Sequence, residues 1–191
     1  MARLLATAPE YPVRLAGPRV ELRDFEPGDL DATLAVVGDP EVTRWLSFDT
    51  RGRAEQAERL AQDIARAASA PRPDYYLAIV GPDGPLIGFA RLGLGGHRSG
   101  EVGYALCRDQ WGHGYATEAA GVLVDFGFRR LGLHRITAAT GPDNAASHAV
   151  LTRLGFRAEG RMRDHVFTNG AWRDSVLFAL LESDWRGLPR P

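Results

Sequence analysis

A glycine-rich segment in the middle of the chain has the residue types that bind a phosphate group. Its residues are Gln110, Trp111, Gly112, His113, Gly114, Tyr115, Ala116, Thr117 and Glu118. The segment precedes a long amphipathic stretch, and a helix start offers free backbone N–H groups and a partial positive charge to an anion. Glycines let the backbone approach a ligand closely, and Ala116 is also small. These residues predict a phosphate site, although a tight glycine turn without a ligand stays open from the segment alone.

Two other phosphate motifs fit the segment poorly. A P-loop needs a lysine, and all 23 basic residues of this chain are arginine. A Rossmann turn has a third glycine after an early strand of a parallel sheet. Here position 117 is threonine, and the strands expected before the segment are antiparallel.

The elements around the segment predict a mixed α/β sheet. Apolar and polar residues alternate over 20–25, which predicts a strand, and helices are expected over 30–37 and 54–68. Gly38, Asp39 and Pro40 should end the first of these helices. Strands over 75–80, 86–94 and 101–107 have connections too short for parallel crossovers, so they form an antiparallel meander.

The second half of the chain continues this sheet. A helix over 115–131 buries the face that carries Ala116, Ala120, Leu123, Val124, Gly127 and Leu131, and turns Glu118, Asp125 and Arg129 elsewhere. A strand over 135–140 follows, and a parallel crossover joins it to strand 101–107. Asn144 is expected to cap a short helix that Gly155 ends. Two strands over 157–167 and 172–181 then form a hairpin around the turn 168–170.

Composition bounds the class of protein. The 191 residues suit one domain, and 45% apolar with 25% charged residues is typical of a globular chain. The net charge of −1 and the lack of a basic stripe disfavour a nucleic-acid partner. The single cysteine, Cys107, excludes an intrachain disulfide, and no histidine has metal spacing with another ligand. No signal peptide or apolar run of about 18 residues is present, so the sequence predicts a cytoplasmic protein without a metal or membrane partner.

Residues 111–116 resemble the acetyl-CoA motif of the GNAT superfamily, commonly (Arg/Gln)-x-x-Gly-x-(Gly/Ala). Trp111 stands where arginine or glutamine is usual, and tryptophan there is typical of the RimJ/RimL-like branch, whose founding members acetylate the N-termini of ribosomal proteins. Segments 101–106, 116–119, 131–136, 144–147 and 154–160 also resemble that branch. The resemblance covers about residues 20–185. It implies one GNAT domain over 1–191, with a core of about 18–185, that acts as an acetyl-CoA-dependent N-acetyltransferase.

The resemblance also implies how acetyl-CoA lies. Backbone N–H groups of Gly112, His113, Gly114, Tyr115, Ala116 and Thr117 would hold the pyrophosphate. The pantetheine arm would run between the strand that ends at Leu106 and Cys107 and the strand 136–140. Asn144 would hydrogen-bond the arm, beside or instead of its cap role, and Ser147 would lie near the sulfur.

Catalytic roles follow from the needs of amine acetylation. A protonated amine must lose a proton before it attacks a thioester, and the resemblance places Glu101 as the base, against the plain reading of a solvated strand-end carboxylate. Ser147 is expected as the acid for the departing thiolate, with Tyr104 as the other candidate. Cys107 has no evident base partner and is expected to be buried and inert.

Acceptor contacts are expected from two loops, residues 39–50 and 95–100. Trp45, Phe48, His97 and Tyr104 are the candidate acceptor-binding residues, although Trp45 and Phe48 could simply pack. Trp172, Phe178 and Trp185 are expected in the core or in a subunit interface. The acceptor is a protein N-terminus or a small-molecule amine, and a homodimer is compatible with the branch. The rival from another class is an inactive acyl-CoA-binding sensor or interaction module.

Overall fold

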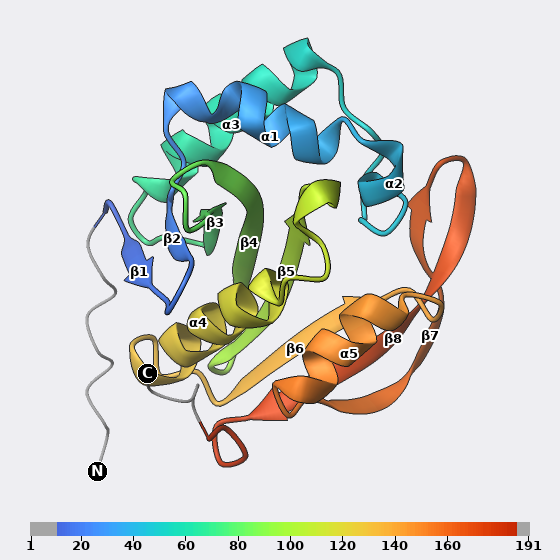
Figure 1. Cartoon of the computed structure of the whole chain (residues 1–191). Coiled ribbons are helices and arrows are strands. Elements are labelled where there is room, and N and C mark those ends of the chain that lie inside the picture. The colour runs from blue at the N-terminus through green and yellow to red at the C-terminus, as the bar shows by residue number, and fades with distance from the viewer. Residues whose placement is uncertain (1–10, 187–191) are drawn as a thin grey trace.

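The computed structural model describes residues 11–186, which form one eight-stranded sheet with helices on both faces (Figure 1). In chain order the elements are β1 (Arg14–Ala16), β2 (Glu21–Asp24), η1 (Pro27–Asp29), α1 (Leu30–Val37), α2 (Pro40–Thr43), α3 (Arg53–Ala67), β3 (Asp74–Val80), β4 (Leu86–Gly95), β5 (Ser99–Leu106), η2 (Arg108–Gln110), α4 (Tyr115–Arg129), β6 (Arg135–Thr140), α5 (Ala145–Arg153), β7 (Arg157–Thr168) and β8 (Ala171–Leu181). The strand order is β1-β2-β3-β4-β5-β6-β8-β7. Within residues 11–186, only β5 and β6 are parallel neighbours. The expected mixed α/β sheet is confirmed.

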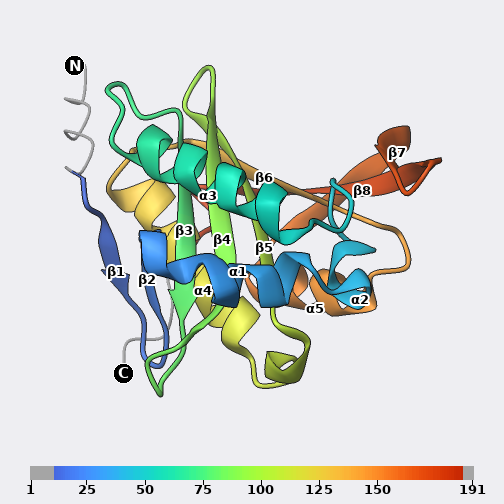
Figure 2. The same cartoon turned by 90° about the horizontal axis from the view of Figure 1, so that it is seen from above.

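Two apolar clusters fix the helices on opposite faces of the sheet. One cluster joins α4 and α5 to the sheet and includes Leu123 and Leu151. The other joins α1, α2 and α3 to the opposite face and includes Val36 and Leu60. Figure 2 shows the same arrangement from above, with α1 and α3 together on one side. Burial of these side chains is the main favourable term that holds the layers together.

The parallel pair is short, and this shapes the site. β5 and β6 pair only over Ser99–Glu101 and Arg135–Thr137. Beyond Glu101, β5 stays paired with β4 while β6 stays paired with β8. The two strands therefore diverge toward their carboxyl ends, as Figure 1 shows.

Local signals predicted most element ends correctly. Gly38 ends α1 by donating its N–H to Leu34 O at 2.8 Å. Asn144 caps α5 by accepting a hydrogen bond from Ser147 N at 3.0 Å. Gly155 follows α5 with φ of +89°, the left-handed conformation that favours glycine.

One expectation needs correction. The stretch after α1 is not only a loop, because Pro40–Thr43 forms α2: Asp39 caps it by accepting from Glu41 N at 2.8 Å, and Pro40 suits a first helical position. The sheet begins at Arg14. Trp172, expected in the core or in a subunit interface, leaves 61% of its surface exposed at the end of the β7–β8 hairpin, so of these two places only an interface stays open to it.

The largest departure concerns Glu118. The helical pattern placed it away from the buried face of α4, yet only 8% of its surface is exposed. Its carboxylate accepts hydrogen bonds from the turn between β1 and β2.

Phe178 is buried as expected, and Trp185 packs partly buried against the main core.

Candidate acetyl-CoA and acceptor site

The 110–117 loop has the backbone geometry of an anion cradle. Gly112 and Gly114 both have φ of +82°, which a residue with a side chain adopts only with strain, and Gly114 is the N-cap of α4. Trp111 remains 42% exposed, but its Nε1 donates to Leu106 O at 3.0 Å. This bond ties the loop back to the end of β5.

The first turn of α4 has free donors. The first hydrogen bond into the helix runs from Glu118 N to Gly114 O at 3.2 Å. The N–H groups of Tyr115, Ala116 and Thr117 have no acceptor within residues 11–186. Together with the positive end of the helix dipole, these donors fit a pyrophosphate.

The opening between β5 and β6 leads away from this loop. Past Glu101, the side of β5 that faced β6 has no strand partner among the described residues, so an extended ligand can lie along it. At the far end of β5, however, two groups are already used: Leu106 O accepts from Trp111, and Cys107 N donates to Ile87 O at 2.8 Å. The structure thus leaves the middle of β5 more available to a pantetheine arm than Leu106 or Cys107.

Tyr104 and Ser147 face each other across the opening. Tyr104 Oη donates to Ser147 O at a long 3.5 Å, and the Ser147 hydroxyl has no hydrogen-bond partner in the described part of the chain. Burial raises the pKa of Tyr104 to about 12. The phenol therefore keeps its proton at neutral pH and can act as a donor. Asn144, which is buried, stands beside both as the cap of α5.

Glu101 lies where β5 and β6 begin to separate. It is opposite Thr137 in the last parallel pair, and its side chain is exposed. Because side chains alternate along a strand, Glu101 shares a face with Ala105, which packs in the α1–α3 cluster. Tyr104 packs against the α4 cluster on the other face. A carboxylate and a phenol thus approach one opening from opposite faces.

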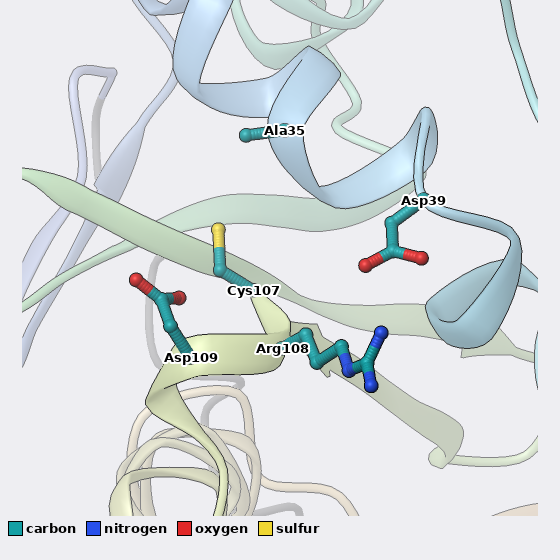
Figure 3. Close-up of a pocket in the computed structure, with 5 residues that line it drawn as sticks. All are labelled: Ala35, Asp39, Cys107, Arg108 and Asp109. Carbon is teal, nitrogen blue, oxygen red and sulfur yellow. The ribbon is translucent and has the colours of Figure 1, made fainter.

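An open cleft of about 580 Å³ lies between α1 and the end of β5 (Figure 3). It is lined by Ala35, Asp39, Cys107, Arg108 and Asp109. Cys107 is half-buried rather than fully buried. Burial, followed by the nearby Asp109 carboxylate, raises the pKa of its thiol, which keeps the protonated, unreactive form. Asp39 belongs to the 39–50 loop that is expected to contact the acceptor, and only the fold brings it to Cys107.

Trp45 and Phe48 lie in a segment that is docked on distant parts of the chain. The Trp45 ring lies against Gly141, where a Cβ would lie 3.8 Å from the ring atom Cε3. Arg173 of β8 donates to the carbonyl oxygens of Arg44 and Leu46. Phe48 is covered by the guanidinium of Arg51, 3.8 Å from the ring centroid. The segment therefore lies beside the carboxyl end of β6.

His97 is not with the other acceptor candidates. It is exposed in the β4–β5 turn with φ of +56°. The neighbouring Arg98 contacts the α4–β6 turn through Gly132 O and His134 N. That turn lies at the amino ends of β5 and β6, whereas Trp45 lies at the carboxyl end of β6. Trp45 and Phe48 lie in one segment, whereas the turn that carries His97 lies at the opposite end of β6.

Among the residues that the structure describes, no group of three or more His, Cys, Asp or Glu side chains could hold a metal ion. Within residues 11–186, no helix has both the length and the apolar character to cross a membrane.

Comparison with known proteins identifies the class to which this fold and site belong. The model of the acetyltransferase (GNAT) domain matches residues 19–157, and the chain belongs to this family. It is an acetyl-CoA-dependent N-acetyltransferase.

Three similar proteins indicate the branch of the family to which the chain is related. The uncharacterized N-acetyltransferase p20 of Bacillus licheniformis is 33% identical over 171 residues, which cover 88% of this chain and 96% of the relative. The [ribosomal protein uS5]-alanine N-acetyltransferase of Escherichia coli is 34% identical over 115 residues, 58% of this chain and 59% of that enzyme. The structure of Mycobacterium smegmatis RimJ in complex with CoA-disulfide superposes with a TM-score of 0.80 at 26% identity, covering 96% of this chain and 93% of that one. The resemblance to the RimJ/RimL-like branch is confirmed.

Proposed function

We propose that the whole chain is one catalytic domain that acetylates the α-amine of a protein N-terminus, with the 112–117 loop as the pyrophosphate site. One observation carries this proposal: the opening between β5 and β6 runs from the free N–H groups at the start of α4 to the Glu101 carboxylate. It gives an acyl donor and an acceptor separate approaches to one point. The relatives are named as N-acetyltransferases, which favours an enzyme over an inactive binding module.

The chemical step needs a base, an oxyanion site and an acid. Glu101 takes a proton from the acceptor ammonium, directly or through water, because only the free amine is a nucleophile. The amine nitrogen attacks the thioester carbonyl, and N–H groups of β5 stabilise the resulting oxyanion. The C–S bond then breaks as the attacking nitrogen loses its second proton. Ser147 or Tyr104 protonates the thiolate, and the proton from the nitrogen restores that hydroxyl through water. Cys107 takes no part, because the acetyl group passes directly to the amine.

Acetyl-CoA binding follows from the same geometry. The glycine loop donates its N–H groups to the pyrophosphate, and Asn144 contacts the pantetheine arm. The unpaired side of β5 fits a chain that bears amides, as a neighbouring strand would. Leu106 and Cys107 contribute mainly side-chain contact, since their backbone groups on this stretch are engaged within the protein.

A peptide N-terminus is the acceptor that the relatives favour. The E. coli enzyme named for ribosomal protein uS5 matches over 58% of this chain, whereas the E. coli spermidine N(1)-acetyltransferase is 27% identical over only 47%. Trp45 and Phe48 supply apolar contacts beside the opening. A ribosomal-protein acceptor would place the reaction in the cytoplasm.

Acetyl-CoA turnover against a panel of acceptors tests this proposal. The panel contains peptides that begin with alanine or serine, the same peptides with blocked N-termini, spermidine and an aminoglycoside. We expect the free peptides to have the highest kcat/KM and the blocked peptides to be inactive. Higher kcat/KM for spermidine or the aminoglycoside would refute the peptide assignment, and no turnover of any amine would favour the binding module.

We also propose a homodimer. Phe167 and Trp172 leave 56% and 61% of their surfaces exposed on the β7–β8 hairpin, and their rings touch at a centroid distance of 5.3 Å. Large exposed aromatic pairs are common at protein interfaces. Light scattering at micromolar concentration decides the point, and a monomer mass refutes the dimer.

A further inference from the structure

The buried Glu118 links the start of the chain to the cofactor loop. Its Oε1 accepts hydrogen bonds from Arg19 N at 2.5 Å and Val20 N at 2.9 Å. Its Oε2 accepts from Arg19 Nε at 2.9 Å. A buried carboxylate is costly unless it is paired and hydrogen-bonded, and here three donors from one turn satisfy it. The link spans about a hundred residues of sequence, so it joins the β1–β2 turn firmly to the first turn of α4.

The Arg19 guanidinium continues this link onto the loop itself. Its Nη1 donates to His113 O at 3.1 Å, and its Cζ lies 4.9 Å from the centroid of the Tyr115 ring. Its Nη2 would be 3.4 Å from a Cβ on Gly114. Arg19 thus contacts His113 and Tyr115, the two neighbours of Gly114, which is the left-handed N-cap of α4.

The guanidinium also has donors to spare. An arginine side chain carries five N–H groups, and this one uses Nε–H on Glu118 and one Nη1–H on His113. The other three have no acceptor among the residues that the structure describes, and half of the side chain is exposed. The planar fork of arginine suits the oxygens of a phosphate group. The loop from Trp111 to Thr117 contains no arginine of its own.

We propose that Arg19, held in place by Glu118, is a positioning residue for the 112–117 loop and adds its guanidinium to the pyrophosphate of acetyl-CoA. This inference rests on the proposed assignment of that loop as the pyrophosphate site. Glu118 sets the direction of Arg19, and the bond to His113 O holds the loop so that its N–H groups converge. The link therefore raises affinity for the phosphate-bearing part of the donor and leaves the acetyl-transfer chemistry unaffected.

Binding of two CoA ligands and turnover of one truncated acetyl donor test the role of Arg19. Titration calorimetry measures Kd for CoA and 3′-dephospho-CoA, and turnover of S-acetylpantetheine, which lacks every phosphate, reports on chemistry. Arg19→Ala should weaken CoA and dephospho-CoA binding equally, by roughly 10- to 100-fold, the range for a hydrogen-bonded charged group. Its kcat/KM for S-acetylpantetheine should stay within about twofold of wild type, since the chemical step is untouched.

Three further variants separate a phosphate role from general stability. Arg14→Ala removes an exposed arginine of the same hairpin, paired with Glu21 and Glu26. It should leave the Kd for CoA and dephospho-CoA and the kcat/KM for S-acetylpantetheine unchanged. Arg19→Lys keeps the charge but not the fork, so its CoA affinity should lie between Arg19→Ala and wild type. Glu118→Gln should weaken CoA binding and also lower the melting temperature of the free protein, because the buried hydrogen bonds weaken.

The outcomes are distinct. CoA affinity of Arg19→Ala equal to that of Arg14→Ala would overturn the inference. So would an equal loss with S-acetylpantetheine, which would mean a structural role only, or a loss that disappears with dephospho-CoA, which would move Arg19 to the 3′-phosphate. If wild type itself showed no preference for CoA over pantetheine, the loop assignment would fail before Arg19 was tested.

Discussion

The proposed site has a cofactor half, residues 104–118 with Asn144, and an acceptor half, residues 39–50, which docks on residues 168–173. In the cofactor half, the end of β5, the glycine loop and the first turn of α4 follow one another in sequence. In the acceptor half, hydrogen bonds join segments more than 100 residues apart: Asn169 N donates to Asp49 Oδ1 at 2.7 Å, and Arg173 holds the carbonyls of Arg44 and Leu46. Contiguous residues preserve one geometry whatever the acceptor, while a docked loop can change its contacts without disturbing the donor site.

Glu101 stands at the junction of the two halves, so its substitution should have the largest effect. Glu101→Gln keeps the shape and removes the basic oxygen. We expect kcat to fall at least ~10²-fold, the lower end for general-base catalysis, with CoA binding nearly intact. The loss should shrink as pH rises toward and above about 8, because solvent then supplies more free amine.

Steady-state kinetics across that pH range and CoA titration check the assignment of Glu101. Glu159→Gln is the matched control, since Glu159 is another strand carboxylate and pairs with Arg135 away from the opening. More than about half of wild-type kcat in Glu101→Gln at neutral pH would show that the base lies elsewhere.

Gly114→Val tests the cofactor half alone. Valine at φ of +82° strains the loop and adds bulk where phosphate should lie. Acetyl-CoA at a hundredfold excess over Kd should stabilise wild type by about 2.7 kcal/mol, and this thermal shift should vanish in the variant. Gly170→Val has the same kind of strain at φ of +71° in the β7–β8 turn and should keep the shift. A full shift in Gly114→Val would place the pyrophosphate elsewhere.

Substitution of Ser147 and of Tyr104 tests which of the two hydroxyl groups protonates the leaving thiolate. Ser147→Ala should lower kcat roughly tenfold, below the usual range for acid catalysis because a thiolate leaves readily. Tyr104→Phe should have a smaller effect, since its hydroxyl points to Ser147 O. With a pKa of about 12, Tyr104 should add no limb to the pH–rate profile below that value. The reverse order of effects would assign the acid to Tyr104.

Trp45→Ala tests the acceptor half alone. Loss of the indole should raise KM for the peptide about tenfold and leave KM for acetyl-CoA within a few-fold, the pattern of lost acceptor binding. Tyr11→Ala removes another exposed aromatic side chain, 46% exposed and outside both halves, and should leave kcat and both KM values unchanged. Equal damage to both substrates by Trp45→Ala would mean that the ring serves packing.

The same contrast explains what the sequence could predict. The loop, the cap at Asn144 and the terminator at Gly155 depend on neighbours within a few residues, and those predictions agree with the structure. The buried Glu118 was missed because its partners, the amides of Arg19 and Val20, are distant in sequence and invisible to helical periodicity. His97 was grouped with Trp45 because both lie in loops, yet the full length of β6 separates the turn of one from the docking site of the other.

Arg173→Ala is the smallest of these changes and asks whether docking matters for acceptor binding. Arg173 holds two carbonyls of the 44–46 segment, while its own Nε is buried without a partner, so removal loses two hydrogen bonds but also relieves one unsatisfied group. We expect about a threefold rise in peptide KM and a fall in melting temperature of roughly 2–4 °C. Acetyl-CoA affinity should not change, because the hydrogen bonds of Arg173 go to the 44–46 segment. Arg161→Ala removes an exposed arginine of the same hairpin, paired with Asp174, and should leave peptide KM at the wild-type value. If Arg173→Ala lowered acetyl-CoA affinity as much as peptide affinity, the two halves would be coupled, and the docked loop would have to be regarded as part of the donor site.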